Sequence, residues 1–353
     1  MNVPVLLIIF NRPDTTQKVF QAIARARPTQ LFIAADGPRQ DKAGEAEACA
    51  MARGIVKQVN WPCELKTNFS DINLGCARHP ANAITWVFNH VDRAVILEDD
   101  CVPHETFFQF CSELLEQYYD DPRIMQIASN NWHFRKRPTS YSYFFSRHII
   151  AAGAWATWRR AWAHYDITIK DWPSYRQTRW LQEIVEHPVA MAHFHALFDW
   201  VFQTSGDNDV WDCQWTFACW AQQALSILPS VTLASNIGFG HPKATHTTSA
   251  SDSLAVLTGF LKIKPMKFPL NHPTEVKRLA EADRFIMETT MVPSWKPVTG
   301  FQANIRKTWI NFLNAHPSLQ SRDAFWKRIR RINLPPQVDQ RTQRDESRTS
   351  NES

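Results

Sequence analysis

The sequence predicts an α/β fold in which a mostly parallel sheet is connected by crossover helices. Over the first hundred residues, short apolar runs alternate with longer segments whose apolar residues repeat at helical spacing, which is typical of such a sheet. The chain has 353 residues, of which 44% are hydrophobic, so it can bury a large core in one or two domains.

Most of the expected strands are short runs that end at turn-forming or acidic residues. They cover residues 4–10, 31–35, 64–69, 94–97 and 125–128. The helical patterns cover about 14–26, 41–59, 80–89 and 107–118. Ligands bind at the carboxyl ends of the strands in open parallel sheets, so the side chains that follow the first four strands should meet at one edge. These side chains are Asn11, Asp36, Asn73 and Asp100.

Three consecutive acids, Glu98, Asp99 and Asp100, follow directly on the apolar strand at 94–97. Like charges this close repel one another and resist burial, and a divalent cation would resolve the conflict. Carboxylate oxygens suit Mg²⁺ or Mn²⁺, which share such sites with substrate phosphates. The alternative is a solvated acidic turn, and the local pattern alone does not separate the two.

Two common phosphate-binding motifs are absent from the sequence. The first strand is followed by Asn11-Arg12-Pro13-Asp14 where a dinucleotide fold would place Gly-x-Gly-x-x-Gly. The sequence also lacks the Gly-x-x-x-x-Gly-Lys-Ser/Thr loop of P-loop enzymes. A diphosphate held through a metal ion is therefore the favoured hypothesis.

Charge, cysteine usage and the apolar N-terminal run bear on the binding partners and the cellular compartment of the protein. The formal charge of +5 is mildly basic and suits an anionic small molecule, a membrane surface or nucleic acid, so charge alone does not separate them; we expect no nucleic-acid partner. The seven cysteines are odd in number and form no Cys-x-x-Cys pair, which favours reduced thiols. The apolar run at 3–10 is too short to span a bilayer and lacks the features of a signal peptide. We expect a cytoplasmic protein, with membrane association left open.

The chain is expected to divide into three parts. Residues 1–265 should form the main domain, with nucleotide and metal binding in 1–128 and the acceptor side in 129–265. Residues 266–336 should form a helical, basic extension, and the polar stretch 337–353 is expected to be disordered. Basic and aromatic residues alternate after about residue 301, which indicates either peripheral membrane contact or a solvated helix face.

Several segments together resemble a known enzyme family. The stretch Val3–Arg12, then Ala35-Asp36-Gly37, then Val95–Asp100 followed by Pro103-x-x-x-Phe107-Phe108 are similar to the nucleotide-binding half of the inverting N-acetylglucosaminyltransferase I family. Later pieces keep that family's order over roughly residues 3–250. They are Gly153–Trp162, Trp211-Asp212, Ser235–Gly240 and Thr245-His246. The resemblance implies a GT-A-like three-layer α/β/α fold whose first half is Rossmann-like.

The resemblance also implies roles for the acids at the end of the strand. Asp100 would bind the metal directly, as Mn²⁺ or Mg²⁺, while Glu98 and Asp99 would support the site and the sugar. The donor would be a nucleotide-diphosphate sugar, with a uridine nucleotide implied by the resemblance only.

On the nucleotide side, the resemblance implies that Asp36 contacts the base and that Asn11 and Arg12 lie beside the nucleotide. For Asn11 and Asp36, turn formation after a strand is the alternative interpretation. The segment from Gly238 to Thr247 has the glycines and small polar residues of a mobile loop beside the donor. His246 in that loop could bind the metal or a phosphate, or could be an ordinary surface histidine.

An inverting transfer needs a base that takes the proton of the acceptor hydroxyl, and Asp212 is the candidate. The family has two adjacent acids after its tryptophan and uses the second, whereas here Asp212 is followed by Cys213. Asp209 is therefore an alternative base, and a base supplied from elsewhere is another. Asp212 could also be a carboxylate that offsets the dipole of a helix N-terminus.

The function expected from these features is metal-dependent, inverting transfer of a sugar from a nucleotide-diphosphate donor to a glycan or lipid-linked acceptor. Two other classes stay open. One is a sugar nucleotidyltransferase or pyrophosphorylase, against which the missing Gly-rich, Arg-containing loop counts. The other is a carbohydrate-binding protein without catalytic activity.

Overall fold

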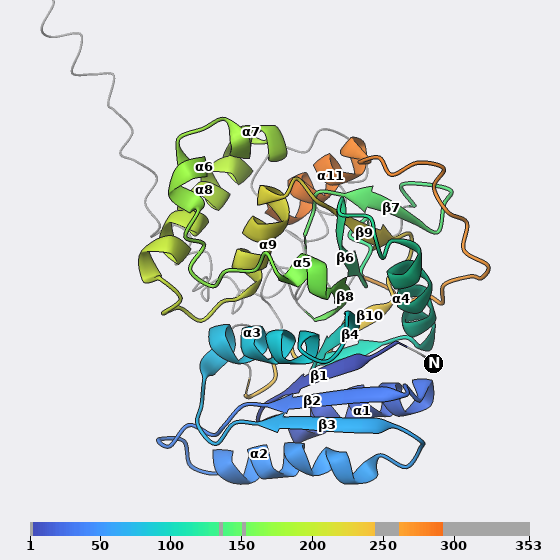
Figure 1. Cartoon of the computed structure of the whole chain (residues 1–353), viewed down its shortest axis with the longest axis vertical. Coiled ribbons are helices and arrows are strands. Elements are labelled where there is room, and N and C mark those ends of the chain that lie inside the picture. The colour runs from blue at the N-terminus through green and yellow to red at the C-terminus, as the bar shows by residue number, and fades with distance from the viewer. Residues whose placement is uncertain (1–2, 134–136, 150–152, 244–260, 292–353) are drawn as a thin grey trace, which may run out of the picture. The chain divides into compact units, whose positions relative to one another are not determined.

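The computed structural model describes residues 3–133, 137–149, 153–243 and 261–291. These residues belong to one compact unit built around a central sheet (Figure 1). The basic C-terminal region, the expected disordered tail and His246 lie outside the described residues.

The central sheet has eight strands in the order β3-β2-β1-β4-β8-β6-β9-β7. Strands β1 to β4 pair in parallel, and β6 pairs in parallel with β9, whereas β8 and β7 are antiparallel to their neighbours. The bounds are β1 Val5–Ile9, β2 Gln30–Ala35, β3 Glu64–Phe69, β4 Arg93–Glu98, β6 Ile124–Ala128, β7 Tyr143–Ser146, β8 Ala154–Trp158 and β9 Leu225–Pro229. A small antiparallel sheet joins β5 (Cys101–Pro103) to β10 (Ala234–Asn236).

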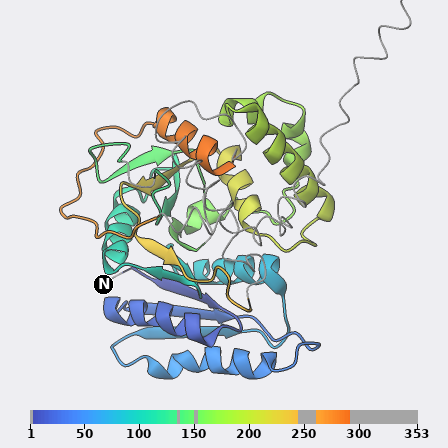
Figure 2. The ribbon, with the colours of Figure 1, turned by 180° about the vertical axis from the view of Figure 1, so that it is seen from behind.

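Helices cover both faces of the central sheet, as Figures 1 and 2 show from opposite sides. One face packs against α1 (Pro13–Ala26), α2 (Glu45–Arg53) and α4 (Glu105–Gln117). The other packs against α3 and the later helices. Their bounds are α3 Gly75–Phe88, α5 Arg159–Trp162, α6 Trp172–Arg176, α7 Trp180–Ile184, α8 Pro188–Thr204 and α9 Asp212–Ala221. The predicted three-layer α/β/α class with a mostly parallel sheet is confirmed.

Strand β1 shows why these runs form central strands. All five of its residues are buried, and they alternate between the two layers of the core. Val5, Leu7 and Ile9 pack on the side of α1, whereas Leu6 and Ile8 pack on the side of α3. A strand that is covered on both faces needs a continuous apolar run, which is the pattern in the sequence.

The helix expected at 80–89 starts earlier than predicted, at Gly75, and has Pro80 inside it. The side chain of Asp36 accepts hydrogen bonds from the backbone N–H groups of Leu74 and Gly75 and so starts the helix. These unpaired N–H groups of a first turn need such an acceptor. Pro80 was therefore a misleading start signal.

The pattern expected as one helix at 41–59 is two elements, α2 and a 3₁₀ turn at Gly54–Gln58. The remaining predicted strands and the helices at 14–26 and 107–118 agree with the structure within two residues at each end.

The described residues after 265 pack on the same unit as the sheet. Met266 and Leu270 join the core on the α1 side, and α11 (Ala280–Ile286) continues into a π-helical turn at Met287–Met291. Asp283 accepts hydrogen bonds from the Ser146 hydroxyl, the Arg147 backbone and Arg278. The functional division expected at residue 265 stays a prediction. None of the described helices is both long enough and apolar enough to cross a bilayer.

Candidate functional site

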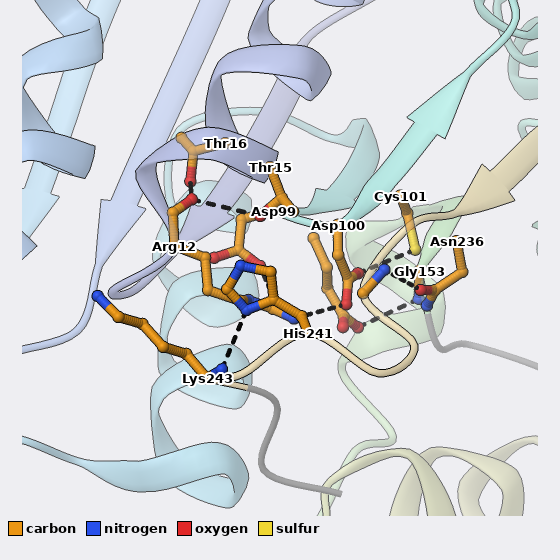
Figure 3. Close-up of polar contacts among 12 residues, drawn as sticks. Arg12, Thr15, Thr16, Asp99, Asp100, Cys101, Gly153, Asn236, His241 and Lys243 are labelled. Carbon is orange, nitrogen blue, oxygen red and sulfur yellow. Dashed lines mark hydrogen bonds and ion pairs between the residues drawn. The ribbon is translucent and has the colours of Figure 1, made fainter. Parts of the chain in front are cut away.

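The acids after β4 meet the segment after β1 at the carboxyl edge of the sheet (Figure 3). This juxtaposition follows from the parallel pairing of β1 with β4, which aligns Ile8 with Glu98. Arg12 then reaches across the two strand ends to Asp99 and Asp100. Of the side chains expected here, Arg12, Glu98, Asp99 and Asp100 are thus brought together.

Arg12 divides its guanidinium between two carboxylates. Its Nη1 donates to Asp100 Oδ2 at 2.9 Å, and its Nη2 pairs with Asp99 Oδ1. Burial lowers the pKa of Arg12 more than any other single effect, but the charges and hydrogen bonds of Asp99 and Asp100 together raise it well above its ordinary value. Arg12 therefore stays charged and is the counter-ion of both acids.

Asp99 is buried, and Arg12 satisfies only one of its oxygens. Asp99 Oδ2 has no hydrogen-bond partner among the described residues. Burial raises the pKa of Asp99 to about 6, although the charge of Arg12 opposes the rise. A carboxylate oxygen that is both buried and unpaired is costly, so this corner of the site is short of a positive or donating group.

Glu98 is the last residue of β4 and directly precedes Asp99. Its Oε1 accepts a hydrogen bond from the backbone N–H of Gly153 at 3.1 Å. Burial, followed by the charge of Asp100, raises the pKa of Glu98 to about 8, and the charge of Asp212 contributes to the rise. Asp212 therefore lies within electrostatic range of this acidic cluster.

Asp100 is enclosed by its neighbours in the chain and by a later loop. Its Oδ1 accepts from Cys101 Sγ at 3.2 Å, and its carbonyl accepts from the N–H of Ile237 at 2.8 Å. A Cβ atom on Gly238 would lie 2.0 Å from Asp100 Oδ2 and 2.9 Å from Arg12 Nη1. Glycine is therefore required at 238, because the backbone passes directly over the ion pair.

The loop after β10 continues from Gly238 toward the start of α1. His241 Nε2 lies 3.3 Å from Asp14, and Lys243 Nζ donates to the Asn11 carbonyl at 3.1 Å. Lys243 thus adds a second cation beside Arg12 (Figure 3). Lys243 was not predicted as a site residue, and the only signal for it in the sequence was the position of this lysine in a basic, glycine-containing loop. The ligand role considered for His246 falls outside the described residues.

Asp36 is fully engaged in holding its own turn. Its Oδ1 accepts from the N–H groups of Gly37 and Leu74, and its Oδ2 accepts from Asn73 Nδ2 and the N–H of Gly75, at distances of 2.8–3.0 Å. These bonds match the turn-forming interpretation of Asp36. The contact with a nucleotide base stays a prediction.

Asn11 is buried and faces α2, away from the acids after β4. Its Nδ2 donates to Glu45 Oε1 at 2.7 Å, and Glu45 also accepts bonds from the backbone and side chain of Arg39. The hydrogen bonds from Arg39 lower the pKa of Glu45 to about 2. Asn11 therefore helps to fix the chain before Arg12, a role the sequence did not indicate, since Glu45 is 34 positions away.

Asp212 is the first residue of α9, and its Oδ1 accepts from the N–H of Cys213 at 3.0 Å. It is half-buried, whereas the alternative base Asp209 is exposed. Burial is the main cause of the raised pKa of Glu98 and of Tyr165, and the charge of Asp212 adds to both shifts. Asp212 therefore lies at the N-terminus of a helix and also within electrostatic range of Glu98.

The donor chemistry of the cluster suits a hard divalent cation, since it consists of carboxylates, one with an unpaired buried oxygen. Within the described residues, no three His, Cys, Asp or Glu side chains are arranged to hold a metal by themselves. Arg12 also occupies Asp100 Oδ2. The residues therefore fit a cation only if a substrate supplies further oxygen ligands.

No family model and no curated protein matches the sequence. Among solved structures, mouse xyloside xylosyltransferase 1 in its apo form is 12% identical and has a TM-score of 0.30; the match covers 75% of this chain and 95% of that one. HddC from Yersinia pseudotuberculosis is 8% identical, with a TM-score of 0.29 and coverage of 48% and 86%. A 4-diphosphocytidyl-2C-methyl-D-erythritol synthase from Anaerococcus prevotii is 7% identical, with a TM-score of 0.28 and coverage of 46% and 74%.

Proposed function

We propose that this chain is a GT-A-type, inverting glycosyltransferase that uses a nucleotide-diphosphate sugar. The observation that carries the proposal is the cluster at the carboxyl edge of the parallel strands, where Arg12 bridges Asp99 and Asp100, with Asp212 within electrostatic range of Glu98. In such sheets this edge is the usual position of a nucleotide ligand. Residues 1–128 would bind the donor, and residues 129–265 the acceptor.

The diphosphate would bind beside Arg12 and Lys243, at the start of α1. A guanidinium can form paired hydrogen bonds with phosphate oxygens, and an ammonium adds a point charge. Asn11 and Asp36 would hold the two turns that flank the nucleotide. Gly238 would let the loop lie close enough to the diphosphate to cover it. We propose a uridine nucleotide as the first donor to test.

Asp100 would hold a Mn²⁺ or Mg²⁺ ion, and Asp99 would support the site beside it. Such an ion acts as a Lewis acid that stabilises the charge on a departing diphosphate. The unpaired buried oxygen of Asp99 supports this assignment.

Asp212 would act as the base of the transfer. It would accept the proton of the acceptor hydroxyl while the hydroxyl oxygen forms a bond to the anomeric carbon, from the face opposite the diphosphate. The bond between that carbon and the diphosphate oxygen breaks with its electron pair, and Arg12 stabilises the resulting charge. Glu98, whose pKa is raised by burial and by the charges of Asp100 and Asp212, would lie between the donor and acceptor sides.

The acceptor would be a glycan or a lipid-linked precursor of a surface polysaccharide, met in the cytoplasm. The basic and aromatic C-terminal region would provide peripheral contact with the membrane. These assignments are supported by the sequence alone.

A panel of nucleotide sugars, incubated with the protein with and without Mn²⁺, tests the proposed function. We expect metal-dependent release of the nucleoside diphosphate, stimulated by the correct acceptor. Formation of pyrophosphate from a nucleoside triphosphate and a sugar phosphate would instead identify a nucleotidyltransferase. Saturable glycan binding without nucleotide release would identify a carbohydrate-binding protein.

A further inference from the structure

Arg12 occupies the oxygen atom that a metal ion would need. Its Nη1 lies 2.9 Å from Asp100 Oδ2, and its side chain is only 17% exposed. A divalent cation on the same oxygen would lie within a few ångströms of the guanidinium, where two positive charges repel strongly. The two cations therefore compete for Asp100.

The surroundings of Asp100 leave the ion little other access. Its Oδ1 accepts a hydrogen bond from Cys101 Sγ at 3.2 Å. The backbone at Gly238 covers Oδ2 so closely that a methyl group on this residue would not fit. Asp100 is 7% exposed. Arg12 must therefore withdraw before a cation can reach this carboxylate.

A diphosphate is the ligand that would draw Arg12 away. It carries the negative charge that the guanidinium would lose on leaving Asp99 and Asp100, and it offers the oxygen pairs that arginine binds well. It also supplies the additional oxygens that a cation needs, since the described acids do not form a three-ligand metal group. Lys243 donates to the carbonyl of Asn11, the residue before Arg12, and so adds positive charge to the same segment.

We infer that Arg12 excludes a divalent cation from Asp100 until a diphosphate binds, so that metal and nucleotide bind as a pair. This inference rests on the proposed function. It makes Arg12 a positioning residue that exchanges carboxylate partners for phosphate partners. By thermodynamic linkage, each ligand must then tighten the other by the same factor.

The wild-type protein is titrated with Mn²⁺ alone and in the presence of UDP, GDP, ADP or CDP, while the magnetic resonance signal of free Mn²⁺ is followed. The reverse titration measures nucleotide binding by calorimetry, in EDTA and in Mn²⁺. We expect weak binding of Mn²⁺ alone and an affinity about tenfold or more higher with the matching nucleotide, with the same factor in the reverse titration.

The variant Arg12→Gln tests the role of the guanidinium directly. It should bind Mn²⁺ alone more tightly than the wild type and bind the nucleotide more weakly in EDTA, so that the coupling factor falls toward one. Arg12→Lys keeps the charge but cannot bridge two carboxylates, and its coupling factor should be intermediate. Arg123→Gln is the matched control, because it removes an arginine that is 60% exposed and pairs with Asp121.

The wild-type titrations decide the matter even if Arg12→Gln does not fold. If a nucleotide binds but Mn²⁺ binds equally well without it, or never binds, the inference is overturned and the proposed transferase survives. An unchanged affinity of a folded Arg12→Gln for Mn²⁺ alone would also overturn the inference. If none of the four nucleotides binds under any condition, the inference and the proposed function fail together.

Discussion

At the scale of single residues, the site depends on how negative charge is distributed among neighbouring acids. Asp99 and Asp100 share Arg12, whereas Glu98 has no cationic partner of this kind in the part of the chain that the structure describes, and burial, followed by the charge of Asp100, raises its pKa. Burial raises the pKa of Glu98 to about 8 and that of Asp99 to about 6, so these two neighbouring acids differ in protonation near neutral pH. Consecutive carboxylates can therefore take different roles in one reaction.

Replacing Asp212 with asparagine should remove the proposed base while preserving the shape of the site. We expect kcat to fall by about a hundredfold or more, the usual contribution of a positioned base. Affinity for the donor should change little, because the proposed function places Asp212 on the acceptor side. Steady-state kinetics and calorimetry with the donor would separate the two effects, and Asp209→Asn tests the alternative base in the same assays. Full activity of Asp212→Asn would show that the base lies elsewhere.

Replacing Gly238 with alanine should push the loop away from the ion pair of Arg12 and Asp100. The added methyl would lie 2.0 Å from Asp100 Oδ2, and overpacking of this kind costs about 1–3 kcal/mol. Urea unfolding would measure the loss of stability, and calorimetry the loss of nucleotide binding. Gly54→Ala is the control, since a Cβ there meets nothing within 4 Å. Equal behaviour of the two variants would argue against the close approach at Gly238.

At the scale of elements, side chains from one strand end determine where the next helix begins. The carboxylate of Asp36, just after β2, accepts the N–H groups of Leu74 and Gly75 at the start of α3. Asn73 donates to the same carboxylate, so the turn after β3 is held against the turn after β2. The edge of the sheet that carries the site is thereby fixed by a single acid.

Replacing Asp36 with alanine should loosen this edge even without a ligand. Loss of a helix cap and of other buried hydrogen bonds costs about 1–3 kcal/mol. We expect that loss in chemical denaturation, together with faster hydrogen exchange in the first turn of α3. Asp71→Ala removes an exposed acid from the same loop and should have little effect. If Asp36→Ala changed nucleotide affinity but neither stability nor exchange, the capping role would be refuted.

At the scale of the whole molecule, the buried His133 links the segment after β6 to α11, and His148 is a second buried histidine. His133 lies 3.1 Å from the Ala282 carbonyl and stacks on Phe285 with ring centroids 5.1 Å apart. Burial lowers the pKa of His133 to about 4 and that of His148 to about 3. Both side chains are therefore neutral in the folded protein at neutral pH.

These histidines predict a loss of stability in mild acid. Between pH 6.5 and 4 the unfolded chain takes up protons that the folded chain does not, so the free energy of unfolding falls as the pH falls. His133 alone should contribute up to about 3 kcal/mol over this window, at 1.36 kcal/mol per pH unit. Urea unfolding from pH 7 to 4.5 measures the slope. His133→Gln should flatten it, whereas the exposed His164→Gln should not. A wild-type slope near zero would contradict the prediction.

The sequence by itself determined the local features of this protein. Continuous apolar runs such as Val5–Ile9 identified the central strands, because a strand covered on both faces has no polar side to show. The acids at 98–100 identified the edge of the sheet where a site should form. The predicted start of α3 was wrong because the acid that caps this helix, Asp36, lies far away in the sequence.

Only the tertiary structure decided which partners these residues meet. Arg12 and Asp100 are 88 positions apart, and they are brought together because β1 pairs with β4 in the sheet. Gly238 comes over the same pair because β10 pairs with β5. The order of strands depends on long-range packing that local patterns do not encode. For that reason the acids after β4 and Arg12 could each be predicted as site residues, whereas the ion pairs between them could not.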